Sequence, residues 1–329
     1  MLRNRKNLLT TKILDSIPKN IKPIEYLIKI LEISKESAYR RLRGEIPFTF
    51  EEMSKLSLDL DFSMDELITK PGESRMLVNM QTYPDDDLST VFLKKFEQYY
   101  EFLLHLEDYP TVETVFTLNH IPPIASVYFK NLFKFFYFKW LHKNNEASLK
   151  LNYSDVVLSD EIEELRKKVR FSTINCANNI TLILDSNLFA SLMNEIQYYH
   201  KRKLINNKDF EDLKNDVLSF VDLLETSTQT GTFGQNAKIN IYLSYMNIEA
   251  NTVHVKYNGN DTSFIYTFLI NPISITHPAI GEKHRKWISS VKKYSMLITK
   301  SNEMLQTEYF DKQREFINSP DNDNFVSLY

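Results

Sequence analysis

The sequence is poor in cysteine and in long uninterrupted apolar segments, and each shortage narrows what the protein can be. Its 329 residues include one cysteine, Cys176, which excludes an internal disulfide and a cysteine-based metal site. The first residues lack the long apolar core of a secretory signal, and the most apolar segment, residues 121–140, contains Lys130, Lys134 and Lys139. We therefore expect a cytoplasmic protein in which Cys176 is a small buried residue and residues 121–140 form a buried aromatic helix.

The short motifs that mark common catalytic sites are also missing. The sequence has no G-x-S-x-G nucleophile elbow, no Walker loop and no dinucleotide fingerprint. His277 and His284 have neither the H-E-x-x-H pattern nor a matching carboxylate, so no metal site is expected. We therefore predict that the protein is not an enzyme and uses no cofactor.

Charge and length indicate how the chain is organised. The formal net charge is -3, so affinity for nucleic acid must come from a local basic cluster and not from the whole molecule. The length is natural for a small module followed by a larger domain, and we predict domains at residues 1–70 and 90–329. Prolines, a glycine and the acidic triplet at residues 85–87 predict a linker over residues 71–89, with the triplet in a solvated loop and a helix capped near Ser89.

Five short helices are predicted in the first domain. Apolar residues repeated every three or four positions indicate the first two helices. Ser34 is suited to cap the third helix, and Gly44 is suited to end it in a left-handed conformation. Thr49 and Ser63 each begin a capping box, with a glutamate three residues later, and these boxes mark the starts of the last two helices. The pattern predicts an all-α bundle that is stable only marginally by itself.

Two segments within this bundle carry a family resemblance. The sequences I-S-K-E-S-A-Y-R at residues 33–40 and T-F-E-E-M-S-K-L-S at residues 49–57, with Gly44 between them, resemble a lambda-repressor-like (Cro-type, XRE) helix-turn-helix domain. The resemblance covers about a fifth of the chain and implies double-stranded DNA as a partner. It implies a first motif helix at residues 22–31, a recognition helix at residues 34–43, and closing helices at residues 50–60 and 64–68.

The predicted recognition helix has a polar and basic outward face, as contact with base edges and phosphates requires. Residues 34–43 contain four basic side chains and one acidic side chain, Glu36, so the formal charge of this segment is +3. Arginine can bind guanine through two hydrogen bonds, and Glu36 can accept one from cytosine, whereas Lys22 is placed to meet a phosphate. The candidate DNA-binding residues are Lys22, Ser34, Lys35, Glu36, Ser37, Tyr39, Arg40 and Arg43.

Two features of this domain leave alternatives open. The family often has an aliphatic residue where this chain has Arg41, so the helix either rotates slightly or uses Leu42 for its core contact. Arg3, Arg5 and Lys6 form a basic arm that either reinforces contact with the DNA backbone or is a frayed terminus.

The larger domain is predicted to be α+β, with helices segregated around an antiparallel sheet. Three runs rich in Ile, Val, Tyr and Phe, separated by Asn-rich turns, predict an antiparallel meander, and two helices are predicted to close the chain. The predicted strands are residues 238–245, 252–257 and 263–270, and the predicted closing helices are residues 282–298 and 302–317.

The function expected from these features is that of a sequence-specific DNA-binding transcription regulator. We expect a homodimer on a two-fold related operator, with the larger domain serving dimerisation or the sensing of a small-molecule or protein effector. Two alternatives remain open. The bundle could instead hold another protein, as an antitoxin or adaptor does, or it could target an enzyme whose site lies in the larger domain.

Overall fold

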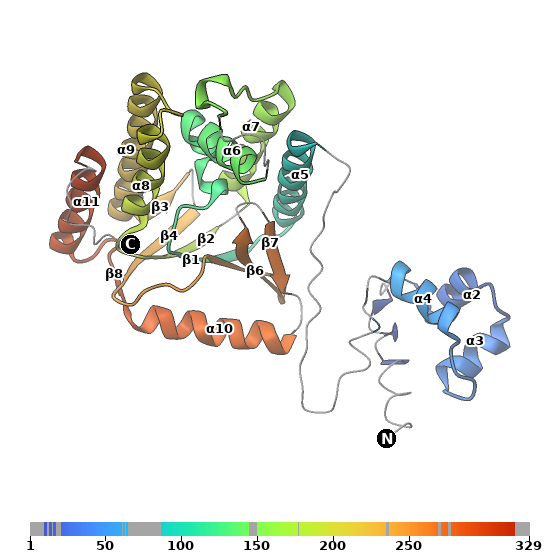
Figure 1. Cartoon of the computed structure of the whole chain (residues 1–329). Coiled ribbons are helices and arrows are strands. Elements are labelled where there is room, and N and C mark those ends of the chain that lie inside the picture. Colours follow the sequence, from blue (N-terminus) through green and yellow to red (C-terminus); the bar gives the residue numbers. More distant parts are fainter. Residues whose placement is uncertain are drawn as a thin grey trace. The chain divides into compact units, whose positions relative to one another are not determined.

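The structure is a computed structural model, and its description rests on two compact units, Met1–Asn79 and Met80–Tyr329 (Figure 1). Each unit has a hydrophobic core of its own and is treated by itself. The described residues are 10–11, 13–14, 16–17, 21–60, 62, 64, 87–144, 150–176, 178–234, 237–268, 271–275 and 278–319.

The first unit is built from short helices around a small core. Its described helices are α2 (Pro23–Leu31), α3 (Lys35–Leu42) and α4 (Phe50–Asp59). Each of these helices contributes a fully buried side chain to one hydrophobic cluster, namely Leu27 of α2, Ala38 of α3 and Leu56 of α4. Ile13 and Ile17 belong to the same cluster. The first and last of the five predicted helices lie wholly or partly outside the described residues.

The predicted helix ends agree with the structure where they are described. The hydroxyl of Ser34 accepts a hydrogen bond from the backbone N–H of Ser37 at 3.2 Å, and the capping box of Thr49 and Glu52 is formed in both directions. Gly44 has the left-handed conformation, with φ of 71°. The second predicted capping box, at Ser63, lies outside the described residues.

The first helix of the second unit begins close to the predicted position. Its cap, expected near Ser89, is Asp87, because the Asp87 carboxylate accepts hydrogen bonds from the backbone N–H groups of Ser89 and Thr90 at 2.9 and 3.0 Å. The hydroxyls of both residues donate to the same carboxylate, and these hydrogen bonds lower the pKa of Asp87. The last residue of the acidic triplet therefore belongs to the helix end.

The second unit contains a sheet with helices on both of its faces. Its helices are α5 (Leu88–Glu107), η2 (Pro123–Tyr128), α6 (Lys130–Asn144), η3 (Tyr153–Asp155), α7 (Asp160–Asn175), α8 (Leu188–Lys201), α9 (Asn207–Thr230), α10 (Pro278–Lys293) and α11 (Glu303–Asn318). Its strands are β1 (Val112–Leu118), β2 (Asn179–Leu184), β3 (Thr232–Phe233), β4 (Ala237–Ser244), β5 (Thr252–Tyr257), β6 (Asn260–Phe268), β7 (Asn271–Ile275) and β8 (Ser295–Leu297).

The sheet is mixed, which corrects the prediction of a purely antiparallel one. Its strand order is β3-β4-β2-β1-β5-β6-β7, and β8 pairs with β4. Strands β1, β2 and β4 run parallel to one another, whereas β5, β6 and β7 continue antiparallel from β1. The predicted meander is therefore wrong at its first step, since β4 pairs with β2 and not with β5. Its second step is confirmed, because Asn258 and Gly259, both with positive φ, form the two-residue turn between β5 and β6.

Two layers of side chains cover the sheet. In β4, Ile239 and Ile241 point into the main core, whereas Tyr242 packs against the separate cluster that includes Ile288 of α10. Figure 1 shows α10 on one side of the sheet and α5 to α9 on the other. The predicted buried aromatic helix at residues 121–140 is found only in part, as α6, in which Phe133 and Phe138 are fully buried. The first part of that segment forms the separate 3-10 helix η2, because Phe129 is extended and interrupts the helix.

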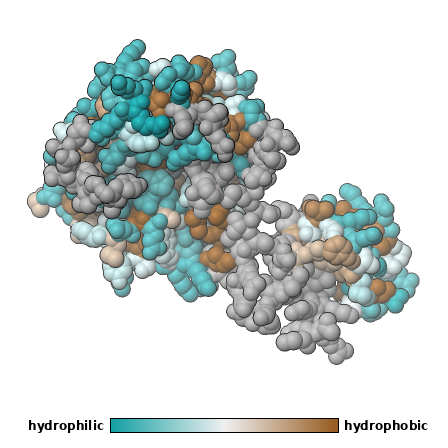
Figure 2. Space-filling model, viewed as in Figure 1, coloured by the Kyte–Doolittle hydropathy of each residue, from teal (hydrophilic) through white to brown (hydrophobic). Residues whose placement is uncertain are grey.

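The surface and the single thiol complete the description of the second unit. The face drawn in Figure 2 is largely hydrophilic, with scattered apolar patches. No helix within the described ranges is both long and apolar enough to span a bilayer. Cys176 is buried and unpaired, as predicted, and burial raises the pKa of its thiol to about 12.

Candidate nucleic-acid interface

The turn between α2 and α3 sets how the two helices meet. It consists of residues 32–34, and Glu32 takes a left-handed conformation with φ of 55°. A helix-turn-helix motif joins its helices through a turn of this length, in which glycine is common. Glu32 provides the left-handed residue without the freedom of glycine, and Ser34 then caps α3.

The burial of α3 defines which of its faces is available for binding. Ala38 is fully buried and Leu42 is half-buried against the core of the first unit. Glu36, Arg40 and Arg43 lie on the opposite face, because successive residues of a helix are rotated by about 100°, and all three are exposed. The outward face of α3 thus carries two guanidinium groups and one carboxylate.

The predicted DNA-binding residues fall into three groups in the structure. Lys35, Glu36, Tyr39, Arg40 and Arg43 are exposed side chains of α3 or its end. Ser34 and Ser37 act within the helix end, since the Ser34 hydroxyl caps the N–H of Ser37, which is half-buried. Lys22 stands at the N-cap of α2, where its side chain is 82% exposed and lies 3.4 Å from the Glu25 carboxylate.

The outward arginines have an acidic neighbour that the sequence analysis missed. Glu45 follows Gly44, and its carboxylate lies 3.5 Å from Arg40 Nε and 3.4 Å from Arg43 Nη1. All three side chains are about half exposed, so these contacts are weak and readily exchanged. Glu45 therefore holds the two guanidinium groups near each other while leaving them open to a stronger anion.

Arg41 explains how α3 tolerates a charged residue where the family has an aliphatic one. Its guanidinium binds both carboxylate oxygens of Glu52, with Nε to Oε2 at 2.9 Å and Nη2 to Oε1 at 2.6 Å. The two side chains are 12% and 14% exposed. Leu42, the next residue, supplies the half-buried apolar contact. Arg41 is thus a structural residue that joins α3 to the start of α4.

Glu52 serves two helices at once. Its Oε2 also accepts a hydrogen bond from the backbone N–H of Thr49 at 2.9 Å, which completes the capping box of α4. Burial opposes ionisation of Glu52, but the hydrogen bonds from Arg41 and Thr49 and the positive charge of Arg41 outweigh it, and the pKa of Glu52 is lowered. The signal for this contact was present in the sequence as an unexpected arginine and a capping glutamate.

A second polar contact fixes α2 against α4. The hydroxyl of Tyr26 donates a hydrogen bond to the carboxylate of Asp59. Burial, together with the adjacent Asp59 carboxylate, raises the pKa of Tyr26. The helix before the turn and the helix after α3 are therefore tied together, which holds α3 in a defined orientation.

Other parts of the predicted site are not described by the structure. The basic arm of Arg3, Arg5 and Lys6 lies outside the described residues, as does His277. Within the described ranges, no three His, Cys, Asp or Glu side chains are grouped as a metal ion would need.

The comparisons with known proteins bear on the first unit. No curated protein matches the sequence significantly. Residues 8–83 match the BetR domain, a family of DNA-binding domains of the helix-turn-helix type. The match spans α2, the turn, α3 and α4, so the part of the chain that presents the arginine-bearing helix is similar to DNA-binding domains of the helix-turn-helix type.

Proposed function

We propose that the protein is a sequence-specific transcription regulator whose first unit is of the lambda-repressor-like (Cro-type) kind and inserts α3 into the major groove. The observation that carries this proposal is the outward face of α3, where Glu36, Arg40 and Arg43 are exposed while Ala38 is buried. A recognition helix needs such a face, because sequence is read through hydrogen bonds to base edges. The proposal assigns no catalytic activity to the chain.

The contacts proposed for individual residues follow from their chemistry. Arg40 and Arg43 can each give two parallel hydrogen bonds to guanine, and Glu36 can accept one from the amino group of cytosine. Tyr39 and Lys35 flank this face. Lys22, which is exposed at the start of α2, is proposed to contact a phosphate.

The assembly is part of the same proposal. A homodimer would place two copies of α3 in successive major grooves, about 34 Å apart along the duplex. The second unit is large enough to supply a dimer contact or an effector site, and we propose that it controls the spacing of the two first units. The preferred operator would then be an inverted repeat.

Selection of binding sites from a random duplex library by the full-length protein tests the proposal. We expect an enriched inverted repeat with half-sites about one helical turn apart. A library that shows no enrichment at moderate salt, with binding equal for all sequences, would contradict a sequence-specific regulator.

Two substitutions separate base reading from phosphate contact. Arg40→Ala should weaken binding to the selected site by about 1 to 3 kcal/mol and relax the preference at one base pair. Lys22→Ala should weaken binding to all duplexes alike and reduce the slope of log K against log salt by about one. Lys168→Ala, an exposed position on α7 of the second unit, is the matched control that should change neither quantity.

A further inference from the structure

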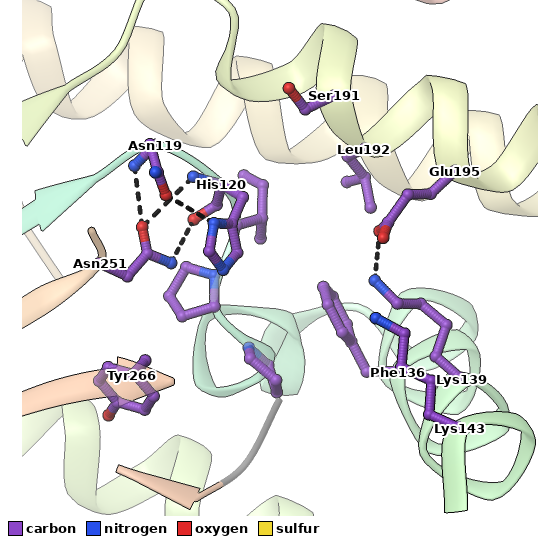
Figure 3. A pocket seen from close by; sticks show the side chains of 13 residues that line it. Asn119, His120, Phe136, Lys139, Lys143, Ser191, Leu192, Glu195, Asn251 and Tyr266 are labelled. Atoms are coloured by element: carbon purple, nitrogen blue, oxygen red, sulfur yellow. Dashed lines mark hydrogen bonds and ion pairs between the residues drawn. The ribbon is translucent and has the colours of Figure 1, made fainter. Parts of the chain in front are cut away.

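The second unit contains a cavity of about 490 Å³ at the end of its parallel strands. Asn119 and His120, which line it, directly follow β1, and Glu195 comes from α8, the helix that follows β2. Lys139 and Lys143 of α6 line its far side (Figure 3). Ligands of α/β proteins commonly bind at the carboxyl ends of parallel strands, in cavities of about 300 to 1,000 Å³.

The α6 side of the cavity carries one positive charge in excess. Lys139 is only 3% exposed, and its ammonium group donates a hydrogen bond to the Glu195 carboxylate. Each of these two charges therefore neutralises the other. Lys143 lies one helical turn further along α6, is exposed, and has no carboxylate within ion-pair distance among the described residues. A buried ion pair beside a lysine that has no carboxylate partner in the described part of the chain favours a ligand with a single negative charge.

The opposite side presents a hydrogen-bond acceptor in a fixed position. Asn251 holds the loop after β1, because its Oδ1 accepts from the backbone N–H groups of Asn119 and His120 at 2.8 and 3.3 Å. The amide of Asn119 donates to the carbonyl of Ile248 at 2.9 Å, which turns its oxygen toward His120 Nδ1 at 2.6 Å. His120 therefore carries its proton on Nδ1, and Nε2 is left as an acceptor.

The electrostatics of the cavity keep this histidine neutral. Desolvation lowers the pKa of His120, and the positive charges of Lys139 and Lys143 add to that effect against the opposing charge of Glu195. An apolar wall lies between the two polar sides and includes Phe136. The cavity thus combines a cation, an acceptor and an aromatic surface.

We propose that this cavity binds a small organic carboxylate that also carries a hydroxyl or amino donor and an apolar group. The carboxylate pairs with Lys143 next to the Lys139–Glu195 pair, the donor bonds to His120 Nε2, and the apolar group packs on Phe136. The site does not depend on the proposed DNA binding, and it would become an effector site only if that function holds.

Calorimetric titration of the full-length protein without DNA tests the inference with three probes of similar size. The probe 3-phenyllactate has all three groups, 3-phenylpropionate lacks the hydroxyl, and 2-phenylethylamine replaces the carboxylate by a cation. We expect saturable binding of 3-phenyllactate at one site, binding of 3-phenylpropionate that is about fivefold weaker because one hydrogen bond is lost, and no binding of the amine.

Variants connect the binding to the cavity. Lys143→Gln should weaken 3-phenyllactate binding by about tenfold or more, because a charge-assisted contact is lost at an exposed position where folding is not at risk. Lys168→Gln on α7, which does not line the cavity, should bind as the natural protein does. Absence of saturable binding of 3-phenyllactate, equal binding of the amine, or an unchanged affinity in Lys143→Gln would each overturn the proposal. Since no DNA is present, such a failure would leave the proposed regulator untouched.

Discussion

Acidification should weaken the attachment of α10 to the sheet, because His284 of that helix is held there in its neutral form. His284 is 8% exposed, and its Nδ1 lies 2.9 Å from the hydroxyl of Ser263 on β6. The same hydroxyl lies 2.8 Å from Nδ1 of His254 on β5, whose Nε2 is 3.6 Å from the Asp261 carboxylate. Asp261 is also paired with Arg285 of α10.

One arrangement of protons satisfies all of these contacts. His254 carries its proton on Nε2, toward Asp261, and accepts the Ser263 hydrogen at Nδ1. His284 then donates its Nδ1–H to the Ser263 oxygen, and its Nε2 is buried without a partner among the described residues. A second proton on His284 would place a charged N–H group where none of the described residues offers an acceptor.

The size of the effect follows from the pKa. Burial, with a smaller contribution from His254, lowers the pKa of His284 from 6.5 to about 4. Between those two values the unfolded chain binds a proton that the folded chain does not, so stability falls as the pH falls. At about 1.4 kcal/mol for each factor of ten in proton affinity, the loss between pH 7 and pH 5 is about 2 kcal/mol. The loss is complete, at about 3 kcal/mol, below the pKa of the folded state.

The assay is urea denaturation at several pH values, followed by the fluorescence of Trp287. This indole stacks on the His284 ring, with 5.7 Å between the ring centroids, and the chain has 2 tryptophans, so Trp140→Phe leaves it as the single reporter. The control adds His284→Asn, which retains a donor for Ser263 but does not titrate. The reasoning is refuted if both proteins lose the same stability between pH 7 and pH 5.

Three further perturbations test the first unit and its interface. Glu52→Gln should destabilise α3 and α4 by about 1.5 to 3 kcal/mol, measured by amide hydrogen exchange, because it leaves the largely buried Arg41 guanidinium without its anion. In an Arg41→Met background the same substitution should cost less, and an equal cost would show that the two side chains are not coupled. Gly44→Ala should lower the free energy of unfolding by about 1 to 2 kcal/mol in the same measurement, because the φ of 71° is unfavourable for alanine. An added Cβ would meet nothing within 4 Å, so backbone strain is the cause tested, and an unchanged exchange rate would contradict it. Glu45→Gln should raise the affinity for every duplex and steepen the salt dependence of binding, measured by fluorescence anisotropy, because Arg40 and Arg43 lose a carboxylate that competes with DNA phosphates. Equal salt slopes for the two proteins would show that Glu45 does not compete with the DNA.

Local signals in the sequence predicted the first unit better than the second. Ser34, Gly44 and the capping box at Thr49 depend on contacts within a few residues, and all three are found in the structure. The pairing of β4 with β2 joins residues such as Ile239 and Ile180, which lie far apart in the sequence. Alternating apolar residues predict a strand but do not say which strand lies beside it or in which direction it runs. The parallel part of the sheet was therefore not predictable from the pattern.

The end of α10 shows a related failure. A single helix was expected over residues 282–298, but the helix ends at Lys293, and Ser295–Leu297 forms β8 against β4. The short strand carries no alternating pattern of its own, and its pairing with the sheet decides its conformation.

For the interface, the sequence pointed to the helix that presents the arginines but not to what controls them. Glu45 lies beyond the predicted recognition helix, and its position beside Arg40 and Arg43 depends on the left-handed turn at Gly44. The pairing of Arg41 with Glu52 joins two helices, and helical spacing within one segment cannot reveal it.

The separation of roles along α3 makes this helix suitable for exchange of recognition residues. Ala38, Arg41 and Leu42 hold α3 to the rest of the first unit, whereas Glu36 and Arg40 have no part in its core. The outward positions could therefore be replaced by those of another helix-turn-helix domain without disturbing the bundle, provided that Arg41 keeps Glu52 as its partner. A library varied only on that face would then change the groups offered to a duplex while the scaffold stays the same.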